Sequence, residues 1–136
     1  LMADLKLTKN QMLVLSVLEK SSIPLSAYTI LERLSEYGLR APPQVYRALD
    51  KLLDLGLAHK LASMNSFLAC QHTQCGSHQV TSFAICDGCE QVSEIINTEF
   101  ERQLNSIAED VGLQPTRSTI EIHGLCDQCA RPNPAT

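Results

Sequence analysis

Residues 42–70 read PPQVYRALDKLLDLGLAHKLASMNSFLAC, and this stretch decides the fold. It opens with two prolines, which are favoured in the first turn of a helix, and Gly56 stands where glycine is favoured, just after a helix end. Between them, valine and leucine recur every three or four residues, which predicts an amphipathic helix. The same spacing leaves Gln44, Tyr46 and Arg47 facing outward near the N-terminal end of that helix.

A β-hairpin is predicted to follow, over residues 57–70. If Met64 and Asn65 form its turn, His59 and Cys70 stand directly opposite each other, with Cβ atoms about 5 Å apart. An imidazole and a thiolate at that spacing are suited to one metal ion. The alternative is that a lone histidine and a lone cysteine occur there by chance.

Two shorter helices are predicted before residue 42. Thr8 and Gln11 form a capping box ahead of the first, whereas Ser26 opens the second and Gly38 ends it. Three short helices followed by a hairpin is the order of a winged helix-turn-helix domain, whose third helix enters the DNA major groove. Gln44, Tyr46 and Arg47 are therefore predicted to contact DNA, with the hairpin as the wing. A plain helical domain with a solvated face is the alternative.

The charge of the 136-residue chain is −4 in total and is unevenly distributed. Residues 1–71 hold eight Lys or Arg and six Asp or Glu, a net charge of +2. Residues 72–136 hold three Arg and nine Asp or Glu, a net charge of −6. Only the first half is therefore suited to contact phosphate. No apolar run approaches the roughly 20 residues of a membrane span, so we expect a cytoplasmic protein without membrane contact.

The second half is predicted to form a separate domain. Residues 72–79 are interpreted as a hinge between a domain at 1–71 and a domain at 80–136. The latter is expected to contain two strands joined by a CDGC turn, a helix with a capping box at Thr98 and Glu101, and a last strand. Four apolar residues of this helix are expected to face inward: Phe100, Leu104, Ile107 and Val111. The predicted fold class is α+β, a winged helix-turn-helix domain followed by an α/β domain with a small antiparallel sheet.

Two CxxC pairs, Cys86/Cys89 and Cys126/Cys129, are the strongest chemical signal. Each pair lets two sulfurs reach one ion from a tight turn, and two such turns complete a tetrahedral four-sulfur zinc site. Four coordinated thiolates leave no open position, so we interpret the site as structural rather than catalytic. A thioredoxin-type redox pair and a disulfide sensor are the alternatives.

A second set of ligands is available around the hairpin. His59 and Cys70 can be joined by His78 from the hinge and Glu94 from the strand after CDGC. One sulfur, two nitrogens and one oxygen make a closed tetrahedral set suited to zinc. The alternative is a solvated carboxylate and an ordinary hinge histidine. Three further residues are either spare or part of another metal site: His72, Cys75 and His123.

Three segments carry a family resemblance: APPQVYRALDKLLDLGLAHKL at 41–61, ICDGC at 85–89 and GLCDQC at 124–129. They resemble the ferric uptake regulator family of bacterial metalloregulators, in particular its zinc uptake regulator branch, and the resemblance covers nearly the whole chain. It implies a homodimeric repressor with a winged-helix DNA-binding domain and an α/β dimerisation domain. The helix that usually precedes the first winged-helix segment is missing, so we expect the chain to begin late relative to the family.

The resemblance also implies residue roles. The structural zinc of the branch falls on the four CxxC cysteines, and its regulatory zinc falls on His59, Cys70, His78 and Glu94. The DNA-contacting tyrosine and arginine of the family match Tyr28 and Arg47. The additional nitrogen and oxygen ligands of iron-sensing members fall near residues that ligate poorly: Val80, Ser82 and Ser118.

These observations predict a zinc-responsive transcriptional repressor that holds two zinc ions per chain. The zinc-loaded homodimer is expected to bind a palindromic double-stranded DNA operator and to repress zinc uptake genes. The usual zinc-enzyme signatures are missing, so neither an enzyme nor a small-molecule substrate is expected. An iron- or peroxide-responsive regulator of the same family, and a zinc-stapled DNA-binding protein without sensing, are the alternatives.

Overall fold

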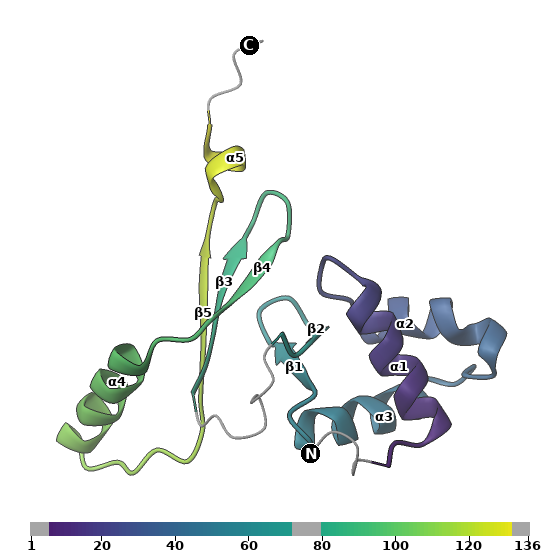
Figure 1. Cartoon of the computed structure of the whole chain (residues 1–136), viewed down its shortest axis with the longest axis horizontal. Coiled ribbons are helices and arrows are strands. Elements are labelled where there is room, and N and C mark those ends of the chain that lie inside the picture. The colour runs from purple at the N-terminus through teal and green to yellow at the C-terminus, as the bar shows by residue number, and fades with distance from the viewer. Residues whose placement is uncertain (1–5, 72–79, 132–136) are drawn as a thin grey trace. The chain divides into compact units, whose positions relative to one another are not determined.

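The computed structural model describes residues 6–71 and 80–131, and the chain divides into two compact units, residues 1–77 and 78–136 (Figure 1). Across the described residues, no helix has the length and apolarity needed to cross a membrane.

The first unit is built from three helices and a hairpin (Figure 1). The helices are α1 (Lys9–Lys20), α2 (Ala27–Leu34, continued by the short 3-10 helix η2, Ser35–Tyr37) and α3 (Pro42–Asp54). The predicted capping box of α1 is confirmed, since the Thr8 hydroxyl accepts from the Gln11 N–H and the Gln11 side chain accepts from the Thr8 N–H. Ser26 caps α2 by accepting from the Thr29 N–H. These caps satisfy N–H groups that a helix start leaves without partners.

The core of this unit lies where the apolar stripes of the three helices meet. Val14 of α1, Ile30 of α2 and Leu49 of α3 are at most 1% exposed. The hairpin, β1 (Ala58–Leu61) and β2 (Ser66–Ala69), packs on this core through Ala58 and Phe67. A short bridge between Leu25 and Phe67 also joins the hairpin to the start of α2. The wing is thereby held against the two helices of the helix-turn-helix.

The register of the hairpin corrects the prediction that His59 and Cys70 stand directly opposite each other. His59 pairs with Leu68, and the Cys70 N–H donates to the Leu57 carbonyl over 2.9 Å. The turn causes the difference, because it contains the four residues 62–65 instead of the expected two. A shift of two residues preserves the alternation of faces, so His59 and Cys70 remain diagonal neighbours on one face of the hairpin.

The second unit contains a three-stranded sheet in the order β4-β3-β5. Its elements are β3 (Val80–Cys86), β4 (Val92–Ile95), α4 (Thr98–Asp110), β5 (Ser118–Gly124) and α5 (Asp127–Ala130). The fold class is α+β, as predicted. The sheet, however, is mixed and not antiparallel throughout, because β5 runs parallel to β3. The connection from β4 to β5 through α4 is long enough to return β5 alongside β3 in the same direction.

Helix α4 departs from its prediction in two respects. Asn97 caps it by accepting from the Phe100 N–H over 2.9 Å, in place of the predicted Thr98 and Glu101 box. No residue of α4 is buried: Ile107 is 62% exposed, and Val111, the residue that caps the end of the helix, is 78% exposed. The apolar stripe exists as expected, but none of the described residues buries it.

Candidate metal centres and DNA-contacting surface

The two CxxC pairs converge in the second unit. One sulfur from each of Cys86, Cys89, Cys126 and Cys129 lies within 4.8 Å of all the others, and the Cys89 and Cys126 sulfurs are 3.9 Å apart. Tetrahedral zinc with Zn–S bonds of about 2.3 Å places its sulfurs about 3.8 Å apart. All four cysteines are free thiols. The donor set therefore fits a closed, four-thiolate zinc site.

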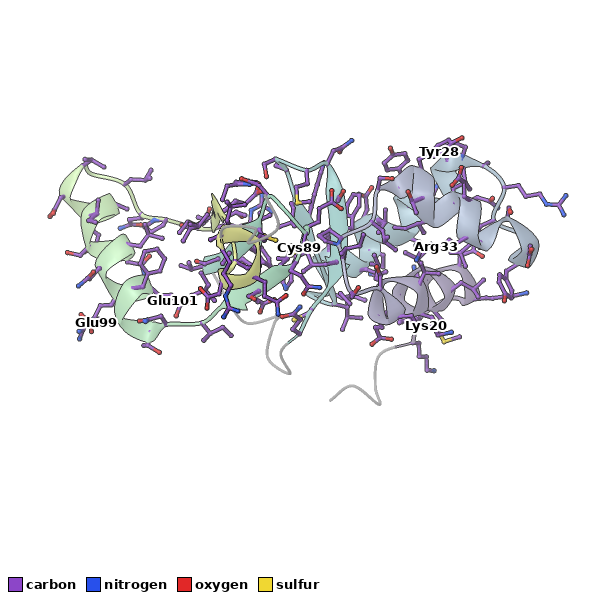
Figure 2. The ribbon with its side chains drawn as sticks, turned by 90° about the horizontal axis from the view of Figure 1, so that it is seen from above. Lys20, Tyr28, Arg33, Cys89, Glu99 and Glu101 are labelled. Carbon is purple, nitrogen blue, oxygen red and sulfur yellow. The ribbon has the colours of Figure 1, made fainter. Side chains whose placement is uncertain are left out.

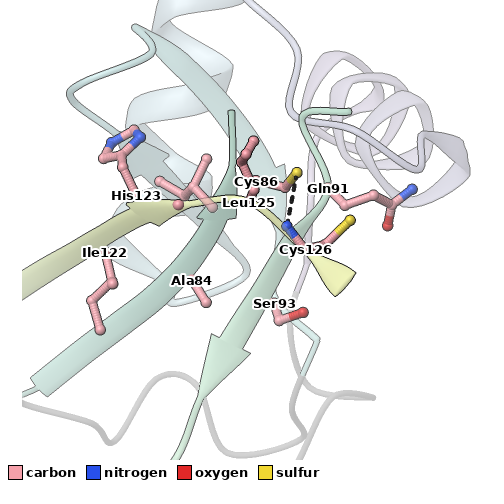
Figure 3. A pocket seen from close by; sticks show the side chains of 10 residues that line it. Ala84, Cys86, Gln91, Ser93, Ile122, His123, Leu125 and Cys126 are labelled. Atoms are coloured by element: carbon pink, nitrogen blue, oxygen red, sulfur yellow. Dashed lines mark hydrogen bonds between the residues drawn. The ribbon is translucent and has the colours of Figure 1, made fainter. Parts of the chain in front are cut away.

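Local backbone geometry aims these sulfurs at one point. Cys86 ends β3, and the chain turns back so that the Glu90 N–H donates to the Cys86 carbonyl over 2.9 Å. The second pair is carried by the single turn of α5, where the Ala130 N–H donates to the Cys126 carbonyl over 2.8 Å. Across the two turns, the Cys126 N–H donates to the Cys86 sulfur over 3.3 Å (Figure 3).

Gly88, between the first two cysteines, leaves room for the second pair. A Cβ atom built on Gly88 would lie 2.8 Å from the Cys129 sulfur and 3.0 Å from its Cβ. Contacts of a Cβ atom below 3.0 Å are essentially never found, so a side chain here would force the Cys129 sulfur or the backbone to shift. The motif therefore requires glycine here for close approach of the two turns.

The surroundings shift the pKa values of these thiols in opposite directions. Backbone N–H groups of Cys126 and Cys89 donate to the Cys86 sulfur and lower its pKa to about 6, so Cys86 is a thiolate at neutral pH. The nearby sulfurs of Cys86 and Cys126 raise the pKa of Cys129 to about 12. For Cys89, the Gln91 N–H lowers the pKa, but the Cys86 sulfur and lost solvation outweigh it and the net shift is upward. Four thiolates this close together repel one another, and a divalent cation bound among them would offset that repulsion.

His123 lies beside the four cysteines, and its neighbours do not make it part of a further metal-ligand set among the described residues. Its Nδ1 is 2.8 Å from an Asp87 carboxylate oxygen, and its Nε2 is 4.0 Å from one of Glu121. Within residues 6–71 and 80–131, His123 belongs to no cluster of three or more converging His, Cys, Asp or Glu ligand atoms. A cavity of about 210 Å³ borders this region, with Ala84 and Ile122 on the sheet and Cys126 at its end (Figure 3). The other two leftover residues, His72 and Cys75, lie outside the described part of the chain.

The second predicted ligand set is described only in part. In the first unit, a ring nitrogen of His59 and the sulfur of Cys70 lie within 4.8 Å of each other. Glu94 belongs to β4 of the second unit, and His78 lies outside the described residues. Cys70 is disulfide-bonded in this structure, and a disulfide sulfur is not a zinc ligand. The pair can bind a metal only after Cys70 is reduced to a thiolate.

Three of the four predicted DNA-contacting residues occupy exposed positions on α2 and α3, and the fourth, Gln44, is half-buried. Tyr28 is 70% exposed and projects from α2 (Figure 2), and Tyr46 is 51% exposed on α3. Arg47 is exposed beside Tyr46 and makes no ion pair with any other described residue. Gln44 differs, because its side-chain oxygen accepts from the Arg40 and Ala41 N–H groups over 3.0 and 3.1 Å. Only its amide N–H groups are left to meet another molecule.

The sequence analysis did not predict two features of the site. Gly88 could have been noticed, because a glycine inside a CxxC turn marks a close approach. The contact between Asp87 and His123 could not, because the two residues are 36 positions apart and neither belongs to a recognisable motif.

Fold and site together define a class: a winged helix-turn-helix unit followed by a small α/β unit that carries a four-cysteine cluster suited to a metal ion. The ferric uptake regulator family model matches residues 2–123, and the chain belongs to this family. The chain is 36% identical over 127 residues to the zinc uptake regulation protein of Escherichia coli (strain K12). That alignment covers 93% of this chain and 74% of the relative.

Two solved structures of zinc regulators are also similar. The crystal structure of holo XcZur has a TM-score of 0.83 at 40% identity, covering 93% of this chain and 88% of that chain. The structure of a zinc uptake regulator complexed with zinc and DNA has a TM-score of 0.85 at 34% identity, covering 94% and 85%. These matches confirm the family resemblance seen in the sequence, including its zinc branch.

Proposed function

We propose that the protein is a zinc-responsive transcriptional repressor, which binds operator DNA as a zinc-loaded homodimer and shuts off genes for zinc uptake. One observation carries the sensing part of this function. The wing hairpin presents an imidazole nitrogen and a sulfur within 4.8 Å of each other, on His59 and Cys70, apart from the four-cysteine cluster. The chain therefore offers a second, separate place for zinc. Similar proteins that are named for zinc uptake regulation, or solved with zinc and DNA, support this function.

The two zinc ions have different roles in this proposal. Zinc at the four cysteines joins the turn after β3 to α5 and stays bound, because it replaces the repulsion between thiolates with four zinc–sulfur bonds. The four thiolates leave no position for a substrate or a water nucleophile, which agrees with a protein that is not an enzyme. The protein is proposed to act in the cytoplasm, where its operator and its metal are available.

Zinc at the regulatory site is proposed to bind His59, Cys70, His78 and Glu94. The thiolate favours zinc over the harder, oxygen-rich surroundings typical of iron sensors. Because the four ligands come from the wing, the hinge and the second unit, binding would restrict how the two units move. A restricted dimer can match the spacing of two operator half-sites. Each tenfold gain in DNA affinity requires about 1.4 kcal/mol of coupling between the zinc and DNA sites.

DNA is proposed to meet the exposed N-terminal part of α3. Arg47 can donate two hydrogen bonds to a guanine, whereas Tyr28 and Tyr46 can contact phosphate or a thymine methyl group. Gln44 is left with a lesser role, since its carbonyl oxygen holds the helix start.

The second unit is proposed to form the homodimer. The exposed apolar residues Ile107, Val111 and Leu113 line one hollow of about 290 Å³ between the end of α4 and the segment before β5. In the described sheet, β5 is also an edge strand. An unpaired edge and an uncovered apolar face are the features that a second copy of the chain would cover.

Zinc stoichiometry and DNA binding of a Cys70→Ser variant test this function. Under reducing conditions the parent should hold two zinc ions per chain and bind operator DNA only when zinc is supplied. The variant should hold one zinc and lose that dependence, because its regulatory site lacks the thiolate. A Ser63→Ala variant in the same hairpin turn is the matched control and should behave as the parent. If parent and Cys70→Ser chains hold one zinc each and bind DNA alike, zinc sensing at this site is refuted.

A further inference from the structure

The parallel ladder between β3 and β5 ends at the pair Cys86 and Gly124, immediately before the metal-binding turns. One more backbone contact follows, because the Asp87 N–H donates to the Gly124 carbonyl over 2.8 Å. Asp87 therefore continues the line of β3 one residue beyond the last ladder pair. The segments that carry the two CxxC motifs diverge from this point.

A side-chain contact spans the same point. His123 pairs with Ile85 in the ladder, and Asp87 is two residues beyond Ile85, so Asp87 and His123 project from the same face of the sheet. Their side chains meet over 2.8 Å, from the His123 Nδ1 to an Asp87 oxygen. An ionised carboxylate can only accept a hydrogen bond, so the ring nitrogen is the donor. Cys86, between Ile85 and Asp87, projects from the opposite face.

We infer that the Asp87–His123 hydrogen bond is a clasp that positions the two CxxC turns for zinc without either residue being a ligand. This inference rests on the structural zinc of the proposed function. The clasp joins residues 36 positions apart, directly next to Cys86 on one side and three residues before Cys126 on the other. Figure 3 shows the His123 ring turned away from the Cys86 and Cys126 sulfurs.

The clasp acts through geometry. Zinc leaves a four-thiolate site when one turn swings away from the other, because all four bonds cannot break at once. A contact that ties β5 to the first turn restricts that swing and returns the Cys126 turn to its place. Hydrogen bonds made directly to metal ligands commonly change metal affinity 10- to 100-fold, whereas this bond acts on the ligands only through the backbone. Both side chains here are partly exposed, at 36% and 59%, so we expect a smaller effect, on the order of 3- to 10-fold.

Zinc release from the full-length chain tests the clasp. Weakly held zinc is first removed with EDTA, and the remaining zinc is then drawn off by excess 4-(2-pyridylazo)resorcinol at constant pH. Asp87→Ala and His123→Ala should each release this zinc about 3- to 10-fold faster than the parent. Asp87→Asn and His123→Asn should release it at the parental rate, because an amide can accept or donate in the same place. Thr119→Ala, an exposed change on the same strand, is the matched control.

The double variant Asp87→Ala/His123→Ala decides whether the two residues act together. A clasp predicts that the double variant releases zinc no faster than either alanine variant alone. Rates that multiply in the double variant, or alanine variants that release zinc at the parental rate, overturn the inference. A parent chain that retains no zinc after EDTA refutes the structural zinc itself, and the clasp with it. Retained zinc with unchanged variant rates refutes the clasp alone.

Discussion

Replacing Gly88 by alanine should weaken the four-cysteine site without disturbing the rest of the fold. The new methyl group would begin 2.8 Å from the Cys129 sulfur, whereas ordinary contacts of this kind begin near 3.4 Å. Sulfur or backbone must therefore move by about 0.6 Å. Zinc–ligand distances tolerate only about ±0.2 Å, so the movement cannot be absorbed by the metal bonds.

The expected loss is on the order of 10- to 100-fold in zinc affinity, or about 1.4 to 2.8 kcal/mol. Gly124→Ala is a matched control, because it lies beside the same site and its Cβ would meet nothing within 4 Å. Neither glycine has a backbone angle that disfavours a side chain, so the two variants differ only in the space available.

Competition with a chelator of known zinc affinity measures the effect for the parent and both variants. Cobalt substitution adds a spectroscopic check, because sulfur-to-cobalt charge transfer reports how many thiolates bind. Equal zinc affinities for Gly88→Ala and Gly124→Ala would show that the turns can separate freely, and the argument from close approach would be wrong.

Three further predictions concern pH, DNA and the dimer. Apparent zinc affinity at the four cysteines should rise at least about 100-fold from pH 7 to 8, because Cys89 and Cys129, whose pKa values are raised, must each release a proton; chelator competition that shows no pH dependence would contradict this. Arg47→Ala should reduce specific operator binding by about 1–3 kcal/mol in a mobility shift while leaving the zinc content unchanged; loss of both would indicate misfolding instead. Val111→Glu should weaken the dimer at least about 100-fold in sedimentation equilibrium, because it places a charge in the apolar hollow at the end of α4; Glu109→Gln is its control, and a dimer unaffected by Val111→Glu would exclude that hollow.

Much of the first unit and the four-cysteine set could be predicted because their signals are local. Thr8 and Ser26 cap helices with groups three residues away, and the periodicity of α3 identifies which of its side chains face the core. Two residues between paired cysteines similarly restrict both sulfurs to one turn. Such short-range geometry depends little on the rest of the chain, and the structure agrees with it.

Predictions of which groups a particular side chain contacts were less accurate. The sequence indicated a polar Gln44 on the outer face of α3, but the fold uses its carbonyl oxygen to hold Arg40 and Ala41. It also indicated an apolar stripe on α4, without saying whether the same chain or another copy covers Val111. An apolar pattern shows that burial is favourable but does not identify the partner.

The sequence by itself determined the helices of the winged unit, the pairing of the four cysteines into one set and the family. Only the tertiary structure decided the two-residue offset of His59 and Cys70, the parallel pairing of β5 and the contact between Asp87 and His123. Hairpin register depends on how many residues a turn takes up, and the pairing of distant strands depends on the path of α4 between them. Both depend on the folded structure as a whole, because contacts between residues far apart in the sequence form only when the segments between them have folded.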